Sequence, residues 1–289
     1  MKDEFRIGAK TKLCAVIGNP IGHSLSPAIH NAAFRALGLD FVYTAFRVED
    51  AGAALAGMRP LENFRGLSIT IPHKIEAMKH VDEVPDIDRK IGCINTAINE
   101  NGRLLGFGTD GPGAIKALED AGVSLAGRRV LMLGAGGAAR AVAFTLAGRT
   151  AIAELTLLDI DENYLRPLAG DLRAGTEKPI AAEKLDEASV RTGIESADIV
   201  IQCTPVGMHP KEDASLVPAG LLRPGLVVFD IVYNPLKTKL LKEAEARGCT
   251  IIPGVEMFVN QAVLQFERFT GVDAPVEVMR NVVLEQLKK

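Results

Sequence analysis

The sequence predicts an α/β protein of two domains, each built on a largely parallel sheet. Before residue 111, short apolar runs alternate with helical patterns, which is typical of strands joined by right-handed helical crossovers. At 129–133 the pattern restarts with Arg-Val-Leu-Met-Leu, followed at once by a glycine-rich turn and an alanine-rich helix. We therefore expect an N-terminal, mostly parallel α/β domain over 1–111 and a Rossmann dinucleotide-binding domain over 112–253.

The elements follow one another in an order that supports this division. Ser26-Pro27 is a good helix start, and Asn101-Gly102 between two strand-like runs predicts a tight hairpin and hence an antiparallel sheet edge. Apolar or alternating runs predict strands at 13–18, 41–46, 66–71, 92–99, 103–107, 129–133, 154–158, 197–203, 225–231 and 249–252. Helical patterns lie at 26–37, 50–58, 110–121, 255–270 and 274–288.

The composition is that of a globular protein and excludes several classes of function. Hydrophobic residues make up 47% and charged residues 24%, and the net charge of -3 comes without a basic cluster, so neither nucleic acid nor an anionic membrane is an expected partner. The first apolar run, 13–17, is too short for a signal peptide or a membrane span, so we expect a cytoplasmic protein. The four cysteines and five histidines lack metal-ligand spacing, and we expect no metal.

Lys74 is the first candidate catalytic residue. Residues 66–71 alternate as a strand does, and Pro72 cannot donate a further ladder hydrogen bond, so Lys74 follows a strand's carboxyl end, where ligands bind in open α/β sheets. Asp110 follows a second strand on the turn Gly108-Thr109-Asp110-Gly111. A lysine and an aspartate on such loops could form a proton-transfer pair. The alternatives are that both are surface charges, or that Asp110 caps the following helix.

Three polar positions in the first domain are candidates for substrate binding. Ser24 and Ser26 would offer two hydroxyls at a helix N-terminus, which suits a carboxylate, although Ser26 could equally be a simple N-cap. Asn95, at the start of a predicted strand, could hydrogen-bond a polyol or form a turn.

The glycine-rich turn carries the dinucleotide fingerprint G-x-G-x-x-A in its required context, between a strand and a helix. Its residues are Gly134, Gly136, Gly137, Ala138 and Ala139. The next strand ends in Asp159, where an acidic side chain would bind the ribose 2′-hydroxyl of NAD, unless it only caps the next helix. A 2′-phosphate within ~4 Å of this carboxylate would be repelled by up to about 4 kcal/mol. The sequence therefore predicts NAD as the cofactor, with NADP disfavoured.

A loop at another strand end and a glutamine complete the candidates. The nicotinamide half of the cofactor is expected beside Thr204, Pro205 and Val206. Gln261 lies among apolar neighbours in a predicted helix, either exposed or turned into a cleft.

Taken together, these motifs resemble those of the shikimate dehydrogenases and their quinate-using relatives. The resemblance runs through the whole chain: Gly-Asn-Pro-Ile-x-His-Ser-x-Ser-Pro at 18–27, Thr-Ile-Pro-His-Lys at 70–74, Gly-Cys-Ile-Asn-Thr at 92–96, Gly-Thr-Asp-Gly at 108–111, the fingerprint at 134–140, and Met-Phe-Val-Asn-Gln-Ala at 257–262. It implies hydride transfer between a nicotinamide cofactor and shikimate, and C-terminal helices, 254–289, that return to the first domain.

The resemblance also implies a role for each candidate. Lys74 and Asp110 would be the catalytic pair, and Tyr233 would join the two serines at the carboxylate. The ring hydroxyls would meet Ser68, Thr70, Asn95 and Gln261, and the nicotinamide pocket would be lined by Gly254 and Met257.

Two departures leave the substrate open. Many members carry asparagine where this chain has Ser68 and Gly108, so quinate is an alternative or second substrate. NADP-using members typically carry Asn-Arg-Thr where this chain has Asp159-Ile160-Asp161, which also favours NAD. Outside the enzyme class, the fold could serve a sensor of shikimate-like acids, although retention of Lys74 and Asp110 argues against this. We expect a monomer or a homodimer.

Overall fold

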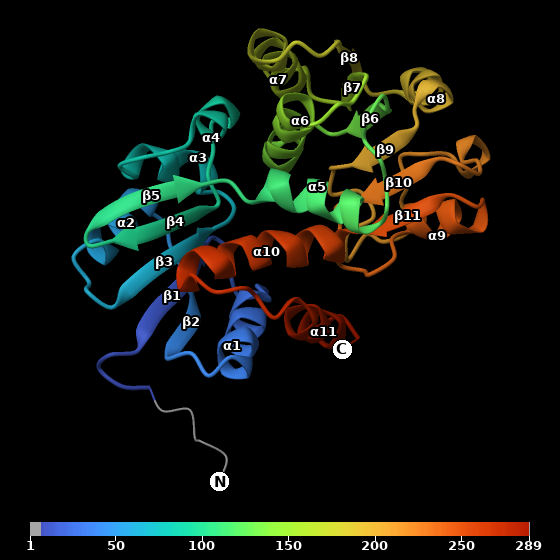
Figure 1. Ribbon diagram of the computed structural model, residues 1–289. Helices are drawn as coiled ribbons and strands as arrows, with labels where there is room; N and C mark the ends of the chain where they lie inside the picture. The colour runs from blue at the N-terminus through green and yellow to red at the C-terminus, as the bar shows by residue number, and fades with distance from the viewer. Residues whose placement is uncertain (1–6, 289) are drawn as a thin grey trace. The chain divides into compact units, whose positions relative to one another are not determined.

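The computed structural model describes residues 7–288 and divides into two compact units. The first unit runs to Thr109 and resumes at Gln261, and the second is Asp110–Asn260 (Figure 1). The expected boundary at 111 lies two residues from the first of these points, whereas the expected boundary at 253 lies seven residues before the second, at the start of helix α10 (Gly254–Thr270). The predicted two-domain α/β fold class is confirmed.

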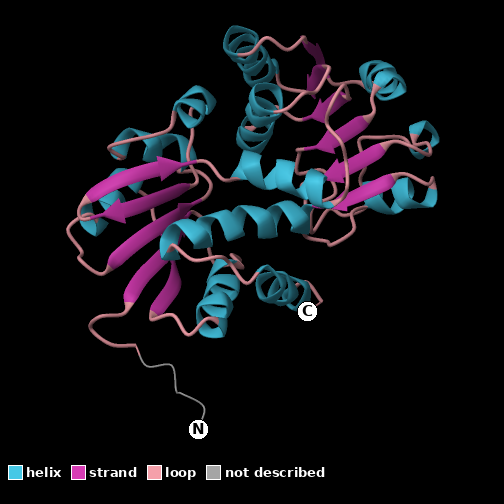
Figure 2. Ribbon diagram, in the orientation of Figure 1, coloured by secondary structure: helices cyan, strands magenta, loops and turns pink. Residues whose placement is uncertain are grey.

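The first unit contains a five-stranded mixed sheet in the order β2-β1-β3-β4-β5 (Figure 2). β1 is parallel to β2 and β3, whereas β3, β4 and β5 pair antiparallel in turn, so β5 runs in the same direction as β1. Asn101 and Gly102 have φ of 55° and 86°, which confirms the hairpin at the sheet edge. The strands are β1 (Lys12–Gly18), β2 (Phe41–Arg47), β3 (Phe64–Ile69), β4 (Thr96–Glu100) and β5 (Arg103–Phe107).

Helices cover both faces of this sheet. On one face, Leu55 of α2 and Ala77 of α3 pack on a core that includes Ile17 and Leu67. On the other face, Phe34 of α1 packs on Phe266 of α10, with 5.3 Å between ring centroids. The helical segments are α1 (Ser26–Ala36), α2 (Ala51–Met58), α3 (Lys74–Ala77), η1 (Met78–His80), α4 (Asp86–Ile91), the second half of α10, and α11 (Val276–Gln286).

Two sequence-based details of this unit were wrong. Residues 92–95 are not part of a strand, because β4 begins only at Thr96. Ser26 is not the N-cap of α1: the cap position is Leu25 and makes no side-chain hydrogen bond, while the Ser26 amide donates to Ser24 Oγ at 3.3 Å. The apolar pattern located the helix, but the cap depended on how the preceding loop arrives.

The second unit is a six-stranded, fully parallel sheet in the order β11-β10-β9-β6-β7-β8. This is the doubly wound order, whose direction of winding reverses between β6 and β9. The strands are β6 (Arg129–Leu133), β7 (Glu154–Asp159), β8 (Ile180–Lys184), β9 (Ile199–Gln202), β10 (Val227–Asp230) and β11 (Thr250–Pro253). The helical segments are α5 (Asp110–Asp120), α6 (Gly137–Arg149), α7 (Glu162–Gly175), α8 (Glu187–Ser196), η2 (Ala219–Leu221), α9 (Lys239–Ala246) and the first half of α10.

The end of α10 is attached to the first sheet by Arg65. Its guanidinium donates to the carbonyls of Arg268 and Phe269, at 3.2 and 2.9 Å, and to Asn99 O at 3.0 Å. A cation at a helix C-terminus satisfies carbonyls that have no intrahelical partner. Gly66 makes room beside it, since a Cβ there would collide with the Phe269 ring.

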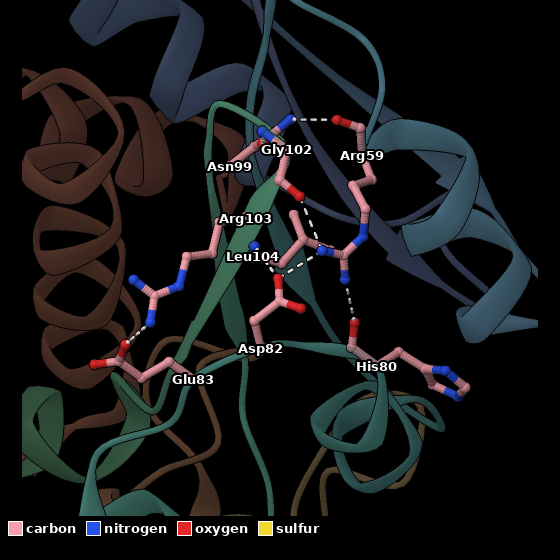
Figure 3. Close-up of polar contacts among 8 residues, drawn as sticks. All are labelled: Arg59, His80, Asp82, Glu83, Asn99, Gly102, Arg103 and Leu104. Carbon is pink, nitrogen blue, oxygen red and sulfur yellow. Dashed lines mark hydrogen bonds and ion pairs between the residues drawn. The ribbon is translucent and has the colours of Figure 1, made fainter.

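A second polar cluster supports the hairpin, at the opposite end of β5 from Thr109 (Figure 3). Arg59 donates to Asp82 Oδ2 at 2.5 Å and to the carbonyls of Gly102 and His80. Asp82 also accepts from the Leu104 amide at 2.6 Å, and these bonds hold the pKa of its carboxyl below the usual range. The cluster joins the end of α2 to the turn between β4 and β5.

Among the helices between residues 7 and 288, none combines the length and apolar character needed to cross a membrane. In the same part of the chain, no three His, Cys, Asp or Glu side chains gather where they could hold a metal ion. The four cysteines are all free thiols.

Candidate functional site

The loops that carry the first-unit candidates leave the sheet along one edge, which is formed by the ends of its strands and lies opposite the β4–β5 hairpin. β1, β3 and β5 end there and β4 begins there, because β4 alone of these four runs in the opposite direction. Thr70 N donates to Ile17 O and Asn19 N donates to Ile71 O, both at 3.0 Å, so the loops after β1 and β3 run side by side. Gly18 allows this approach, since a Cβ there would lie 2.5 Å from Thr70 Cγ2.

Lys74 is the first residue of α3 at this edge, and its side chain is half-buried. Its carbonyl accepts from the Ile94 amide at 3.0 Å, which ties the start of α3 to the segment before β4. The preceding His73 is buried and its Nε2 bonds Val48 O at 2.8 Å. Two neighbouring segments therefore fix the backbone from which Lys74 extends.

Tyr43 lies among the predicted serines, although sequence reasoning did not identify it. Its hydroxyl donates to Ser68 Oγ at 2.6 Å and is also hydrogen-bonded to the Ser26 side chain. Burial raises the pKa of this phenol, so it stays protonated. His30 stacks on the Tyr43 ring with centroids 4.4 Å apart, and burial lowers the pKa of His30 to about 3, which keeps the imidazole neutral.

Asn95 is buried just before β4, where the same edge also carries Thr109. Its Oδ1 accepts from the Thr109 amide at 2.8 Å, and its Nδ2 donates to Thr109 Oγ1 at 2.9 Å. Thr109 directly precedes Asp110, which opens α5 in the second unit. Gly108 packs against Asp88, whose Oδ1 would lie 2.6 Å from an added Cβ, so an asparagine at this position would require Asp88 to move.

The fingerprint turn of the second unit has the backbone that the motif predicts. Gly134 has φ +108°, and a Cβ on it would lie 3.1 Å from the carbonyl of Cys203, the residue after β9. α6 begins at Gly137, and nothing lies within 4 Å of the Cβ positions of Gly136 and Gly137. An open helix N-terminus with exposed glycines fits a pyrophosphate, because its amides and dipole favour negative charge.

Asp159 belongs to the fingerprint turn in a way the sequence did not show. Its Oδ2 accepts from the Ala135 amide at 2.6 Å, and its Oδ1 accepts from the Asp161 amide at 2.8 Å. The N-cap of α7 is Asp161, not Asp159. The Asp159 carboxylate therefore connects the end of β7 to the turn after β6.

Buried polar side chains at the ends of β9 and β10 hydrogen-bond to the loops that follow these strands. Gln202 donates from Nε2 to the carbonyls of Thr204 and Val206, at 2.9 and 3.1 Å, and accepts from the Thr204 amide at 2.6 Å. Asp230 accepts from the Thr238 hydroxyl at 2.6 Å and from the Val232 amide at 3.0 Å. Burial raises the pKa of Asp230 to about 6.

The remaining second-unit candidates lie beyond β10 and β11. Tyr233 is half-buried and stacks on Phe258 of α10, with centroids 4.7 Å apart, and burial raises the pKa of its phenol. Gly254 starts α10 where a Cβ would collide with the backbone of Ile231 and Val232. Met257 is buried one turn further along the helix.

Known proteins resemble this chain over almost its whole length. Residues 16–97 match the model of the shikimate dehydrogenase substrate-binding domain, and residues 254–284 match that of the shikimate 5'-dehydrogenase C-terminal domain. A shikimate dehydrogenase (NADP(+)) from Moorella thermoacetica is 44% identical over 98% of this chain and 96% of its own length. The chain belongs to the shikimate dehydrogenase family.

Two further members of the shikimate dehydrogenase family give the same result. A shikimate dehydrogenase (NADP(+)) from Geobacillus kaustophilus is 42% identical over 96% of this chain and 99% of its own length. The crystal structure of shikimate 5-dehydrogenase from Listeria monocytogenes, in complex with shikimate and NAD, has a TM-score of 0.91 at 35% identity and covers 96% of this chain and 98% of that chain.

The prediction that NAD is the preferred cofactor was wrong. The shikimate dehydrogenases of Moorella and Geobacillus are both named for NADP(+), as is the relative from Methanosarcina mazei at 44% identity. The predicted repulsion required the Asp159 carboxylate to face the ribose without another partner. Both of its oxygens instead accept backbone amides, which fixes the side chain against the fingerprint turn.

Sequence reasoning missed several polar residues that contact the predicted site of this shikimate dehydrogenase family member. All of them are buried, and Tyr43 and Gln265 have partners far away in the sequence. Their only signal is a polar residue in an otherwise apolar run, as in 262–266. The missed residues are Tyr43, Thr96, Thr109, Gln202, Asp230 and Gln265.

Proposed function

We propose that the protein catalyses the reversible, NADP(+)-dependent oxidation of shikimate to 3-dehydroshikimate. The observation that carries this proposal is the 44% identity to a shikimate dehydrogenase (NADP(+)) over 98% of the chain. The second unit supports it with an open fingerprint turn at the N-terminus of α6. The first unit supports it with hydroxyl, amide and ammonium groups gathered at one sheet edge.

Lys74 and Asp110 are proposed to exchange the proton of the reacting hydroxyl. Losing a hydride from a secondary alcohol leaves its oxygen proton to be removed, and the reverse reaction needs that proton returned. When bound, the nicotinamide cofactor accepts or donates the hydride. Lys74, half-buried at the start of α3, can act as ammonium or amine, with Asp110 holding its charge and position.

The other site residues are assigned as the family resemblance implied. Ser24, Ser26 and Tyr233 would bind the carboxylate, and Ser68, Thr70, Asn95 and Gln261 the ring hydroxyls. Gly134, Gly136, Gly137, Ala138 and Ala139 would hold the pyrophosphate. The nicotinamide would lie beside Thr204, Pro205, Val206, Gly254 and Met257.

Initial rates with shikimate or quinate, each paired with NADP(+) or NAD(+), test the proposal. We expect the highest kcat/KM with shikimate and NADP(+). A higher value with quinate would change the substrate. Tight shikimate binding without turnover in any combination would show a sensor instead of an enzyme.

The free cysteines fit a reducing cytoplasm, which we propose as the location. We also propose a monomer or homodimer, which light scattering coupled to gel filtration would distinguish from larger assemblies.

A further inference from the structure

A chain of hydrogen bonds is buried in the first unit beneath the predicted substrate residues. It starts at β2, where the Tyr43 hydroxyl donates to Ser68 Oγ on β3 at 2.6 Å. The Ser68 hydroxyl donates in turn to Oε1 of Gln265 on α10, at 2.8 Å. The single hydroxyl hydrogen of Ser68 is thus donated to Gln265 and not to a ligand.

From Gln265 the chain continues to the residue before Asp110. Gln265 Nε2 donates to Thr96 Oγ1 at 3.0 Å and to the carbonyl of Asn95 at 3.1 Å. The Thr96 hydroxyl donates to Asn95 Oδ1 at 3.0 Å, and Asn95 Nδ2 donates to Thr109 Oγ1 at 2.9 Å. Every side-chain link from Tyr43 to Thr109 can therefore donate in the same direction.

Burial makes the orientation of this chain costly to change. The six side chains, those of Tyr43, Ser68, Thr96, Asn95, Thr109 and Gln265, belong to residues that are at most 4% exposed. Removing the partner of a buried polar group costs more free energy than removing the partner of an exposed one. Aligned hydrogen bonds also strengthen one another. A flipped Asn95 amide would face the Thr109 amide with a donor.

Gln265 links the two halves of this chain of hydrogen bonds, because its side-chain amide both accepts and donates. The carbonyl end accepts from β3, and the NH2 end donates to β4 and to the segment before it. Attachment of α10 does not depend on this amide, since Arg65 binds the helix end and Phe266 and Phe269 are fully buried beside it. The amide is thus available for a role beyond docking the helix.

We propose that Gln265 is a positioning residue of the substrate site, which sets the side-chain orientations of Ser68 and Asn95 without touching the ligand. The inference deepens the proposed function and rests on it, because both residues are assigned there to the ring hydroxyls of shikimate. Oriented this way, Ser68 presents a hydrogen-bond acceptor to a ligand, and Asn95 is fixed against Thr109.

The kinetic test compares Gln265→Met with Arg65→Met. Gln265→Met keeps the side-chain volume but interrupts the chain of hydrogen bonds. We expect the KM for shikimate to rise about tenfold, because misplaced binding groups cost rate and affinity. The KM for NADP(+) should stay within about twofold. Arg65→Met is the matched control, because it removes contacts to the same helix, α10, and leaves the chain of hydrogen bonds intact. It should lower Tm and leave both KM values nearly unchanged.

Two results would overturn the inference: an unchanged KM for shikimate in Gln265→Met, or an equal rise in Arg65→Met, which would reduce Gln265 to a docking contact. If Gln265→Met does not fold, Gln265→Glu decides. It keeps the acceptor for Ser68 but faces the Asn95 carbonyl with an oxygen, so the same selective rise in KM is expected, and its absence also overturns the inference.

Hydrogen exchange provides a readout that needs no turnover. The Thr109 amide donates to Asn95 Oδ1, and Gln265→Met should speed its exchange about tenfold, whereas Arg65→Met should speed exchange only near residues 268–270. Peptide mass spectrometry over residues 95–109 measures this. If the wild type does not oxidise shikimate, the proposed function fails while exchange still tests the positioning role. Unchanged exchange at Thr109 would overturn it.

Discussion

At the scale of single residues, position relative to a strand end decides what a charged side chain can do. Lys74 starts α3 just beyond the end of β3, with its backbone held by Ile94. Lys79, one turn further on, is exposed and paired with Glu76 at 2.7 Å. The two lysines share their chemistry and differ in location, so they form a matched pair for mutation.

Replacing Lys74 by alanine should lower kcat at least ~100-fold and leave the KM for shikimate within about tenfold, the range for losing a general acid or base. Lys79→Ala should keep near-normal kinetics. Steady-state assays at saturating cofactor measure both. Near-normal turnover by Lys74→Ala would show that the proton leaves by another route.

Asp159→Ala should raise the KM for the cofactor about tenfold, because the fingerprint turn loses the carboxylate that accepts the Ala135 amide. The KM for shikimate at saturating cofactor should change little. Asp186→Ala is the control, since this carboxylate also accepts a backbone amide but caps α8. An unchanged cofactor KM in Asp159→Ala would show that the turn holds its shape unaided.

Asp230 should make stability depend on pH in the direction opposite to a salt-bridged carboxylate. Burial raises its pKa from 3.8 to about 6, so the folded state binds the proton more tightly than the unfolded chain does. Its stabilising contribution is complete below pH 3.8 and is lost as pH rises through 6. Two pKa units correspond to about 3 kcal/mol.

Urea unfolding of the wild type and Asp230→Asn at several pH values isolates this contribution. The stability of the wild type relative to the variant should fall by about 3 kcal/mol between pH 3 and pH 7. Because the variant cannot ionise, other titrating groups cancel in the difference. Parallel curves would mean that Asp230 does not titrate in this range.

At the scale of elements, one glycine sets how closely two helices of the second unit approach. A Cβ on Gly111 of α5 would collide with Thr145 Oγ1 of α6 and lie 2.6 Å from the Ala141 carbonyl. The sequence motif Gly-Thr-Asp-Gly contains this residue, and its second glycine thus serves helix packing. Gly170 in α7, by contrast, has nothing within 4 Å of its Cβ position.

Gly111→Ala should therefore lower the free energy of unfolding by about 1–3 kcal/mol through overpacking. Gly170→Ala should raise it by up to about 1 kcal/mol, because alanine favours a helix interior more than glycine does. Thermal or urea unfolding measures both. A neutral Gly111→Ala would show that α5 and α6 separate freely.

At the scale of the whole molecule, the last part of the chain completes the core of the first unit. Residues from Gln261 onward contribute Phe266, Phe269, Met279 and Val283 to its core, all 1% exposed or less. Burying each such side chain is worth about 1.5–3 kcal/mol, comparable in sum to the whole stability of a domain.

A chain that ends at Asn260 should consequently keep a folded second unit and lose the first. Calorimetry of the full chain and the truncated chain would show the loss of a transition, with increased proteolysis confined to residues before 110. Retention of both transitions would mean that the first unit folds without residues 261–289.

Much of this protein could be predicted from sequence because the signals are local. The apolar runs at 13–17 and 129–133, the Asn101-Gly102 turn and the fingerprint at 134–139 each specify their own backbone within a few residues. Helices α3 and α4 were missed because they are short and lack a full apolar stripe. Strand β8 and helices α8 and α9 were not identified either, and α7 was expected only as a helix after Asp159, without bounds.

The sequence by itself determined the fold class, the dinucleotide fingerprint, the family and the positions of Lys74 and Asp110 at strand ends. Only the tertiary structure decided that Asp159 binds the fingerprint turn, that Ser68 donates to Gln265, and that Gln265 reaches Asn95, 170 positions away. The physical reason is that periodicity and turn chemistry act between neighbours, whereas a buried hydrogen bond selects its partner only when folding brings distant groups together in the absence of water.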